Sequence, residues 1–179
     1  MNNEHLDFTN EEAVTKILEG DSTESIEELR NFHNLSPEKI ELMSQFAKLR
    51  KQVKDDCWKE VEERKSQNPK FSDDENDLDC YIEAIEPQVR YALLALRKKG
   101  YDTFESGFHG FDKQNIGLSA MQLKNFTPPE SLVGYLKAKG VTLKISPNNI
   151  EFECNKFLDL DELKNIWDQV EQNLPDLNQ

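Results

Sequence analysis

Residues 103–112 place polar and charged side chains beside two glycines and three phenylalanines. Glycines at 107 and 110 permit positive φ angles and expose backbone amides to a ligand. In this segment His109 has the chemistry of a general acid or base, Asp112 can orient it, and Ser106 can serve as a nucleophile. The predicted ligand-binding residues are Glu105, Ser106, Gly107, His109, Gly110 and Asp112.

Short-range geometry argues against catalysis by this segment. Ser106, His109 and Asp112 would have to converge within a single turn, which so short a separation rarely permits. The simpler interpretation is a structural turn that carries an exposed histidine. A concave pocket around His109, with a carboxylate or hydroxyl within hydrogen-bonding distance, would favour catalysis instead. We therefore expect a protein that is not an enzyme.

The sequence contains no metal or cofactor motif. Zinc binding at His109 with Glu105 or Asp112 would lack further imidazoles nearby, because the other two histidines lie in the N-terminal part. The alternating acids of residues 73–79 suggest a calcium loop, but the glycine and the final glutamate that an EF-hand needs are absent. Phosphate-loop and dinucleotide patterns are also missing. We predict no metal and no cofactor.

The formal charge of −13 is unevenly distributed. Acids are concentrated in residues 1–30, 71–79 and 151–179, whereas residues 31–70 and 80–150 carry a small excess of bases. The acidic ends argue against nucleic-acid binding, which needs a local excess of cations. No signal peptide or membrane-spanning segment is recognisable, and three widely spaced cysteines suggest buried free thiols. We expect a soluble cytoplasmic protein without a membrane partner.

These candidate residues need a scaffold, whose first part is a helical N-terminal region over residues 1–66. Two short helices are predicted between residues 9 and 34, the first opening with a capping box at Thr9. Ser36 and Pro37 then begin a long amphipathic helix that extends to about residue 66. Its apolar stripe is formed by Ile40, Leu42, Met43, Phe46, Ala47, Leu49, Val53, Cys57, Trp58 and Val61. Either the short helices fold back onto this stripe or a second copy pairs with it as a coiled coil.

An acidic linker over residues 67–79 leads to a second part, residues 80–179. A helix from Pro87 buries one face and stops at Gly100, after which residues 101–108 are predicted to form a strand. Residues 116–123 are a further strand candidate beyond the glycine-containing turn. The helix, glycine and strand then recur at the same spacing, ending the second helix at Gly140, which suggests an internal duplication.

The second unit has the clearer pattern. Residues 127–130 resemble a capping box with proline at the first helical position. Alternating residues 141–145 and 150–154 predict a hairpin that pairs Val141 with Cys154 and joins its strands by a four-residue loop, 146–149. Asp159 then caps a final helix. The predicted fold is α+β, with a helical arm followed by an α-β-β-α-β-β-α module around a mainly antiparallel four-stranded sheet.

The leading functional expectation is a non-enzymatic cytoplasmic module that binds a protein or a small ligand. Its helical arm is expected to support self-association through the N-terminal helices. One alternative is a small enzyme or ligand-binding domain that uses the turn over residues 106–112. Another is an acidic inhibitor of a basic protein, whose terminal acids would converge on one face.

Overall fold

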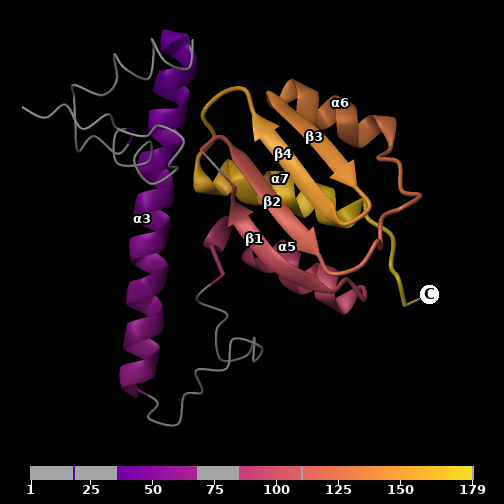
Figure 1. Cartoon of the computed structure of the whole chain (residues 1–179), viewed down its shortest axis with the longest axis horizontal. Coiled ribbons are helices and arrows are strands. Elements are labelled where there is room, and N and C mark those ends of the chain that lie inside the picture. Colours follow the sequence, from indigo (N-terminus) through magenta and orange to yellow (C-terminus); the bar gives the residue numbers. More distant parts are fainter. Residues whose placement is uncertain (1–17, 19–35, 68–84, 110, 179) are drawn as a thin grey trace, which may run out of the picture.

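The computed structural model describes residues 18, 36–67, 85–109 and 111–178, and within them a long helix stands beside an α+β module (Figure 1). The helices are α3 (Pro37–Gln67), α5 (Pro87–Lys98), α6 (Glu130–Ala138) and α7 (Leu160–Gln172). The strands are β1 (Thr103–Phe108), β2 (Lys113–Leu118), β3 (Val141–Ser146) and β4 (Asn149–Cys154). This order confirms the predicted α+β fold. Among the described helices, none has the length and apolarity that crossing a bilayer requires.

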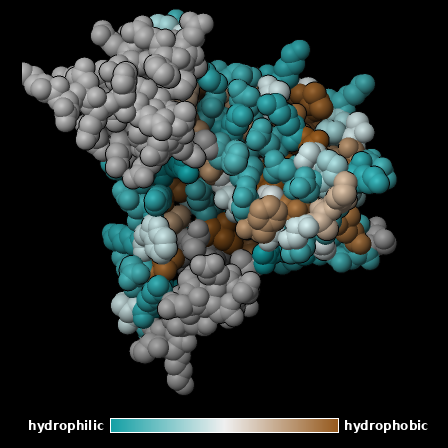
Figure 2. Space-filling view, in the orientation of Figure 1, coloured by the Kyte–Doolittle hydropathy of each residue, from teal (hydrophilic) through white to brown (hydrophobic). Residues whose placement is uncertain are grey.

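The four strands form one antiparallel sheet in the order β1-β2-β4-β3. Helices α5 and α7 lie behind the sheet in Figure 1, and α6 flanks its β3 side. The opposite face of the sheet carries no helix of the module, and Figure 2 shows hydrophilic side chains over much of it. Candidate binding residues can therefore be sought on this open face.

The β3–β4 hairpin confirms the predicted register. Val141 pairs with Cys154, Leu143 with Phe152, and Lys144 with Glu151 on the outer side. The predicted loop was too long, because Ser146 pairs with Asn149 and only residues 147 and 148 form the turn. The backbone pairing continues one residue beyond Ile145 and Ile150, the last apolar pair. Alternation of apolar side chains cannot predict this additional polar pair.

The first hairpin differs more from its prediction. Strand β1 starts at Thr103 instead of 101, and β2 occupies residues 113–118 instead of 116–123. Alternation could not locate β2, because its buried residues include the polar Gln114 and Asn115. Leu123 is buried as well, but it belongs to the segment after the strand. The β1–β2 hairpin therefore buries polar side chains that the β3–β4 hairpin does not.

Helices α6 and α7 differ in how they begin. The capping box predicted at residues 127–130 is wrong, because α6 starts at Glu130 with Pro129 as an N-cap that makes no side-chain bond. Consecutive prolines favour extended backbone, which delays the helix. Helix α7 has the expected box: the Asp159 carboxylate accepts from the Glu162 amide at 2.9 Å, and the Glu162 carboxylate accepts from the Asp159 amide at 3.2 Å.

The core lies between the sheet and the helices. Trp167 of α7 is fully buried against Phe152 of β4, with ring centroids 4.8 Å apart. Burying an aromatic side chain of this kind contributes about 1.5–3 kcal/mol. The same apolar cluster includes Phe46, Val53 and Cys57 of α3. The long helix therefore shares the core of the module.

Helix α3 begins and ends where the sequence predicts, but its apolar stripe is narrower. The Phe46 ring lies 5.2 Å from the Phe157 ring of the module, whereas Trp58 is 56% exposed. Leu18 is buried, and its carbonyl accepts a hydrogen bond from Ser44 Oγ at 2.8 Å. Apart from Leu18, the predicted short helices, the acidic linker and the calcium-like residues lie outside the described residues. The division into regions 1–66, 67–79 and 80–179 stays a prediction.

Candidate functional site

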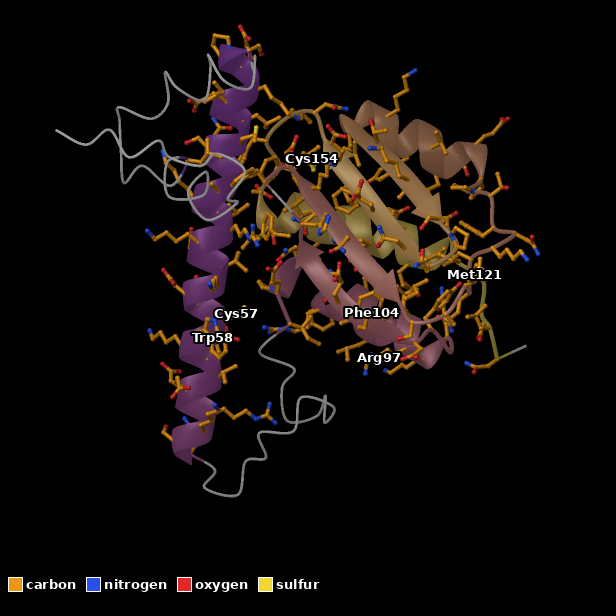
Figure 3. The ribbon with its side chains drawn as sticks, viewed as in Figure 1. Cys57, Trp58, Arg97, Phe104, Met121 and Cys154 are labelled. Carbon is orange, nitrogen blue, oxygen red and sulfur yellow. The ribbon has the colours of Figure 1, made fainter. Side chains whose placement is uncertain are left out.

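An exposed aromatic side chain marks the open face of the sheet. The pairing of β1 with β2 shifts between Thr103 and Glu105, and Phe104 lies at this irregularity. Its side chain is 63% exposed (Figure 3). The ring lies close to the β2 backbone, because a Cβ placed on Gly117 would come within 2.7 Å of Phe104 Cζ. A glycine thus makes room for a phenylalanine that the core does not cover.

The Glu105 side chain lies beside Phe104 above Gly117. Asn115 Nδ2 donates a hydrogen bond to Glu105 Oε1. His109 Nδ1 lies 4.0 Å from the same carboxylate oxygen, and the His109 and Glu105 side chains are 57% and 50% exposed. This separation is too long for a hydrogen bond. The immediate surroundings of Phe104 therefore include a solvated carboxylate without a close Lys or Arg partner among the described residues.

The other charges on the open face are paired. Lys144 Nζ lies 3.8 Å from Glu151 Oε1 and 3.4 Å from Glu153 Oε2. Lys39 of α3 reaches the same face, with its Nζ 3.5 Å from Glu153 Oε1. Partial burial raises the pKa of Glu153, but Lys39 and Lys144 outweigh it and hold that pKa below its usual value. Among the described carboxylates of this face, Glu105 is therefore the one without a lysine or arginine within 4.0 Å.

The Asp112 carboxylate contacts α3 and does not orient His109. Its side chain is only 8% exposed and forms an ion pair with Lys39 Nζ. Burial lowers the pKa of Lys39, yet the bond to Asp112 outweighs it and raises that pKa overall. The backbone carbonyl of Asp112 also accepts from the Cys154 amide at 2.8 Å. This arrangement fixes the start of α3 to one end of the sheet.

Gly107 provides space for a buried carboxylate. Its φ is +104°, and a Cβ there would come within 2.2 Å of Glu86 Oε2. That oxygen accepts hydrogen bonds from the Phe108 amide at 2.9 Å and from Gln88 Nε2 at 2.7 Å. Burial raises the pKa of Glu86, although these bonds and Arg50 oppose the shift. Gly107 therefore has a structural explanation that needs no ligand.

The predicted site residues consequently separate into different environments. Glu105 and His109 lie at the exposed rim, while Gly107 and Asp112 are buried in contacts with α5 and α3. Ser106 pairs with Ile116 in the ladder. Within the described residues, no hydrogen bond joins Ser106, His109 and Asp112, and no group of three or more potential ligands is arranged for a metal. Gly110 lies outside the described residues.

Sequence reasoning missed the residues that act across long separations. Lys39 and Asp112 are 73 positions apart, and Glu86 reaches Phe108 across 22 positions. No local pattern reports such contacts. Phe104 did have a signal, because its phase in the strand is opposite to that of the apolar residues in the second unit. Taken with the neighbouring glycine at 117, this phase indicates an outward-facing aromatic residue.

A separate cavity lies between α3 and the start of α5. It has a volume of about 250 Å³, and its described lining is Arg50, Lys54, Cys57, Trp58, Val61 and Glu86. Burial raises the pKa of the Cys57 thiol, with Arg90 opposing the shift. The exposed Trp58 ring and the nearby cations give this cavity an aromatic wall and a positive side.

Comparison of the chain with protein-family models, with curated proteins and with solved structures finds no match.

Proposed function

We propose that the chain is a non-enzymatic module that binds a protein partner on the open face of its sheet, with Phe104 as the anchor. The observation that carries this proposal is the 63% exposure of Phe104 at an irregularity of β1, above Gly117 of β2. Irregular strand positions commonly redirect side chains at functional sites. Large aromatic side chains such as Trp and Tyr are also enriched among the residues that carry most of the binding energy in protein interfaces.

The setting of Phe104 favours binding energetically. Full burial of a phenylalanine contributes about 1.5–3 kcal/mol, most of which is still available while the ring is exposed. The backbone at Gly117 supports the ring from one side, so less side-chain freedom is lost on binding. The anchor is therefore partly preorganised before the partner arrives.

Charge defines the partner more closely. The Glu105 carboxylate lies beside Phe104, and the whole chain carries a formal charge of −13. A complementary protein would present an apolar pocket bordered by Lys or Arg. Association with such a surface would be faster at low ionic strength, because long-range attraction is screened by salt. This partner class combines the predicted binding module with the acidic-inhibitor alternative.

The structure gives less support to two other predictions, catalysis by His109 and self-association through the N-terminal helices. His109 is largely solvated and makes no hydrogen bond to a carboxylate or hydroxyl within the described residues, so we do not propose catalysis. Self-association through the N-terminal helices would need an uncovered stripe on α3. Phe46, Val53 and Cys57 of that stripe instead join the core of the module.

Site-specific photocrosslinking tests the proposed surface. A benzophenone amino acid would replace Phe104 in one variant and Tyr91 in a matched control. Tyr91 is 65% exposed on α5, in the helical layer behind the sheet. We expect the probe at position 104 to crosslink a discrete basic protein that the probe at 91 does not capture. Equal capture at both positions, or none at 104, would contradict the proposal.

Small-molecule binding is a second candidate, favoured by the cavity of about 250 Å³ beside Trp58. Its lining suits an aromatic compound with an anionic group. Anilinonaphthalene sulfonate is a suitable probe, because energy transfer from Trp58 would report its position. We expect Trp58→Phe to reduce the energy transfer to the contribution of the buried Trp167, and Lys54→Ala to weaken binding. Unchanged binding in both variants would exclude this cavity.

A further inference from the structure

The two edges of the sheet differ in how their outward backbone groups are used. At the β1 edge, the Phe108 amide donates to Glu86 Oε2 at 2.9 Å. The Thr103 carbonyl accepts from Arg97 Nη2 at 2.8 Å, and Arg97 Nε donates to Thr103 Oγ1 at 2.8 Å. Side chains of α5 and of its N-cap thus occupy this edge. Such covering is a common protection against strand addition.

Helix α6 flanks the β3 side of the sheet (Figure 1), but within the described residues no side chain of α6 makes a hydrogen bond to the β3 backbone as Arg97 and Glu86 do at β1. The Asn155 amide donates to the Gly140 carbonyl at 2.7 Å, which sets the alternation of the β3–β4 ladder. Residues 142, 144 and 146 therefore bond to β4, whereas the backbone groups of Val141, Leu143 and Ile145 face outward. No described residue makes a hydrogen bond to these outward groups. Leu143 and Ile145 are also only half-buried.

We infer that β3 pairs with β3 of a second copy of this chain, antiparallel and centred on Leu143. Centring places Leu143 opposite its own counterpart and Val141 opposite Ile145. These are the residues whose backbone groups point outward, so one register satisfies all of them. A two-fold axis makes the contact isologous and closes it at two copies. The four-stranded sheets would then join into a continuous sheet.

The side chains fit the same register. On the core side, Val141 meets Ile145 and the two Leu143 side chains meet each other, which covers apolar surface that one copy leaves half-exposed. On the outer side, Lys144 lies opposite Thr142 of the second copy, so the two Lys144 cations avoid each other. Lys144 is also neutralised by Glu151 and Glu153 of its own copy. In this register no like charges of β3 face each other across the axis, so the strand can pair with its own copy.

Opposite charges at position 142 provide a matched test. Thr142 is exposed and pairs with Glu153 of β4 in its own copy. Thr142→Glu would place an anion opposite Lys144 of the second copy while lying beside Glu153. Thr142→Lys would place a cation opposite Lys144 while gaining Glu153 as a neighbour. Both variants lose the same 3.2 Å bond from Asn155 Nδ2 to Thr142 Oγ1.

Dimerisation and folding stability should therefore change in opposite directions. By sedimentation equilibrium, we expect a wild-type dimer, a Kd roughly tenfold lower for Thr142→Glu and roughly tenfold higher for Thr142→Lys, because each substitution acts twice across the axis. By urea unfolding of the monomer, Thr142→Lys should be the more stable variant. The difference in Kd should narrow in high salt.

Two results would overturn this inference. One is a wild-type chain and a Thr142→Glu variant that both remain monomeric across the micromolar range, which would leave the β3 edge to a peptide of another protein. The other is a dimer whose Kd is the same in both variants, which would place the contact elsewhere on the surface.

Discussion

At the residue scale, Gly107 and Gly134 show how position decides what a glycine does. Gly107 has a φ of +104° beside the Glu86 carboxylate, whereas a Cβ on Gly134 within α6 would meet nothing within 4 Å. We expect Gly107→Ala to reduce the free energy of unfolding by at least about 1–3 kcal/mol, through backbone strain and displacement of Glu86. Gly134→Ala should increase it by about 0.5–1 kcal/mol.

Urea unfolding of the two alanine variants measures both effects. An equal increase in the free energy of unfolding for Gly107→Ala and Gly134→Ala would mean that the backbone at position 107 relaxes without strain. The pair separates conformational strain from a general effect of adding a methyl group.

Two carboxyl groups should give opposite dependences of stability on pH. Burial raises the pKa of Glu86 in the folded state. Ionisation of Glu86 therefore lowers the free energy of unfolding as the pH rises above the pKa of this group in the unfolded state. Glu86→Gln keeps an oxygen that can accept from the Phe108 amide, and we expect it to stabilise the fold at neutral pH. That gain should disappear as pH falls below about 4.5, where the unfolded-state carboxyl is protonated.

Glu153 is the matched comparison. Lys39 and Lys144 outweigh the effect of burial and lower its folded-state pKa, so its contribution is present above the unfolded pKa and is lost as pH falls through the folded one. Glu153→Gln should therefore destabilise the fold at neutral pH, and that loss should vanish in acid. Thermal unfolding between acid and neutral pH measures both variants. A destabilising Glu86→Gln at neutral pH would show that Arg50 outweighs burial.

At the element scale, the predictable parts are those specified by local sequence. Alternation identifies the β3–β4 pairing, and Asp159 with Glu162 identifies the start of α7. Strand β2 was misplaced, because buried Gln114 and Asn115 interrupt its apolar pattern. The contact of α3 with the sheet depends on Lys39 and Asp112, 73 positions apart, which no periodicity reveals.

The capping box of α7 makes a direct prediction. Asp159→Ala removes the acceptor of the Glu162 amide and should lower the free energy of unfolding by about 1 kcal/mol. Asp161→Ala is the control, because it lies in the same first turn but is not the N-cap. It should cost less, about 0.3–1 kcal/mol from the helix dipole. If urea unfolding gives the same decrease in the free energy of unfolding for both variants, the side-chain bond of the N-cap has no stabilising effect of its own.

At the scale of the whole molecule, one side of the sheet is packed against helices and the other side is exposed. Helices α5 and α7 bury one face of the sheet, α3 is fixed at one end by the Lys39–Asp112 ion pair, and Phe104 is left on the open face. The sequence predicted the framework of the module. Phe104 and His109 are both exposed, and the phase of Phe104 in its strand is a sequence signal for this, but the sequence does not show which face of the sheet the helices leave open.

The affinity for the crosslinked partner tests the central proposal most directly. Isothermal titration calorimetry would compare the wild-type chain with Phe104→Ser and with Tyr91→Ser, after thermal unfolding has shown that both variants are folded. We expect Phe104→Ser to weaken binding by about tenfold or more, as loss of a hot-spot aromatic residue does, and Tyr91→Ser to leave it unchanged. Equal affinity of wild type and Phe104→Ser would contradict the account.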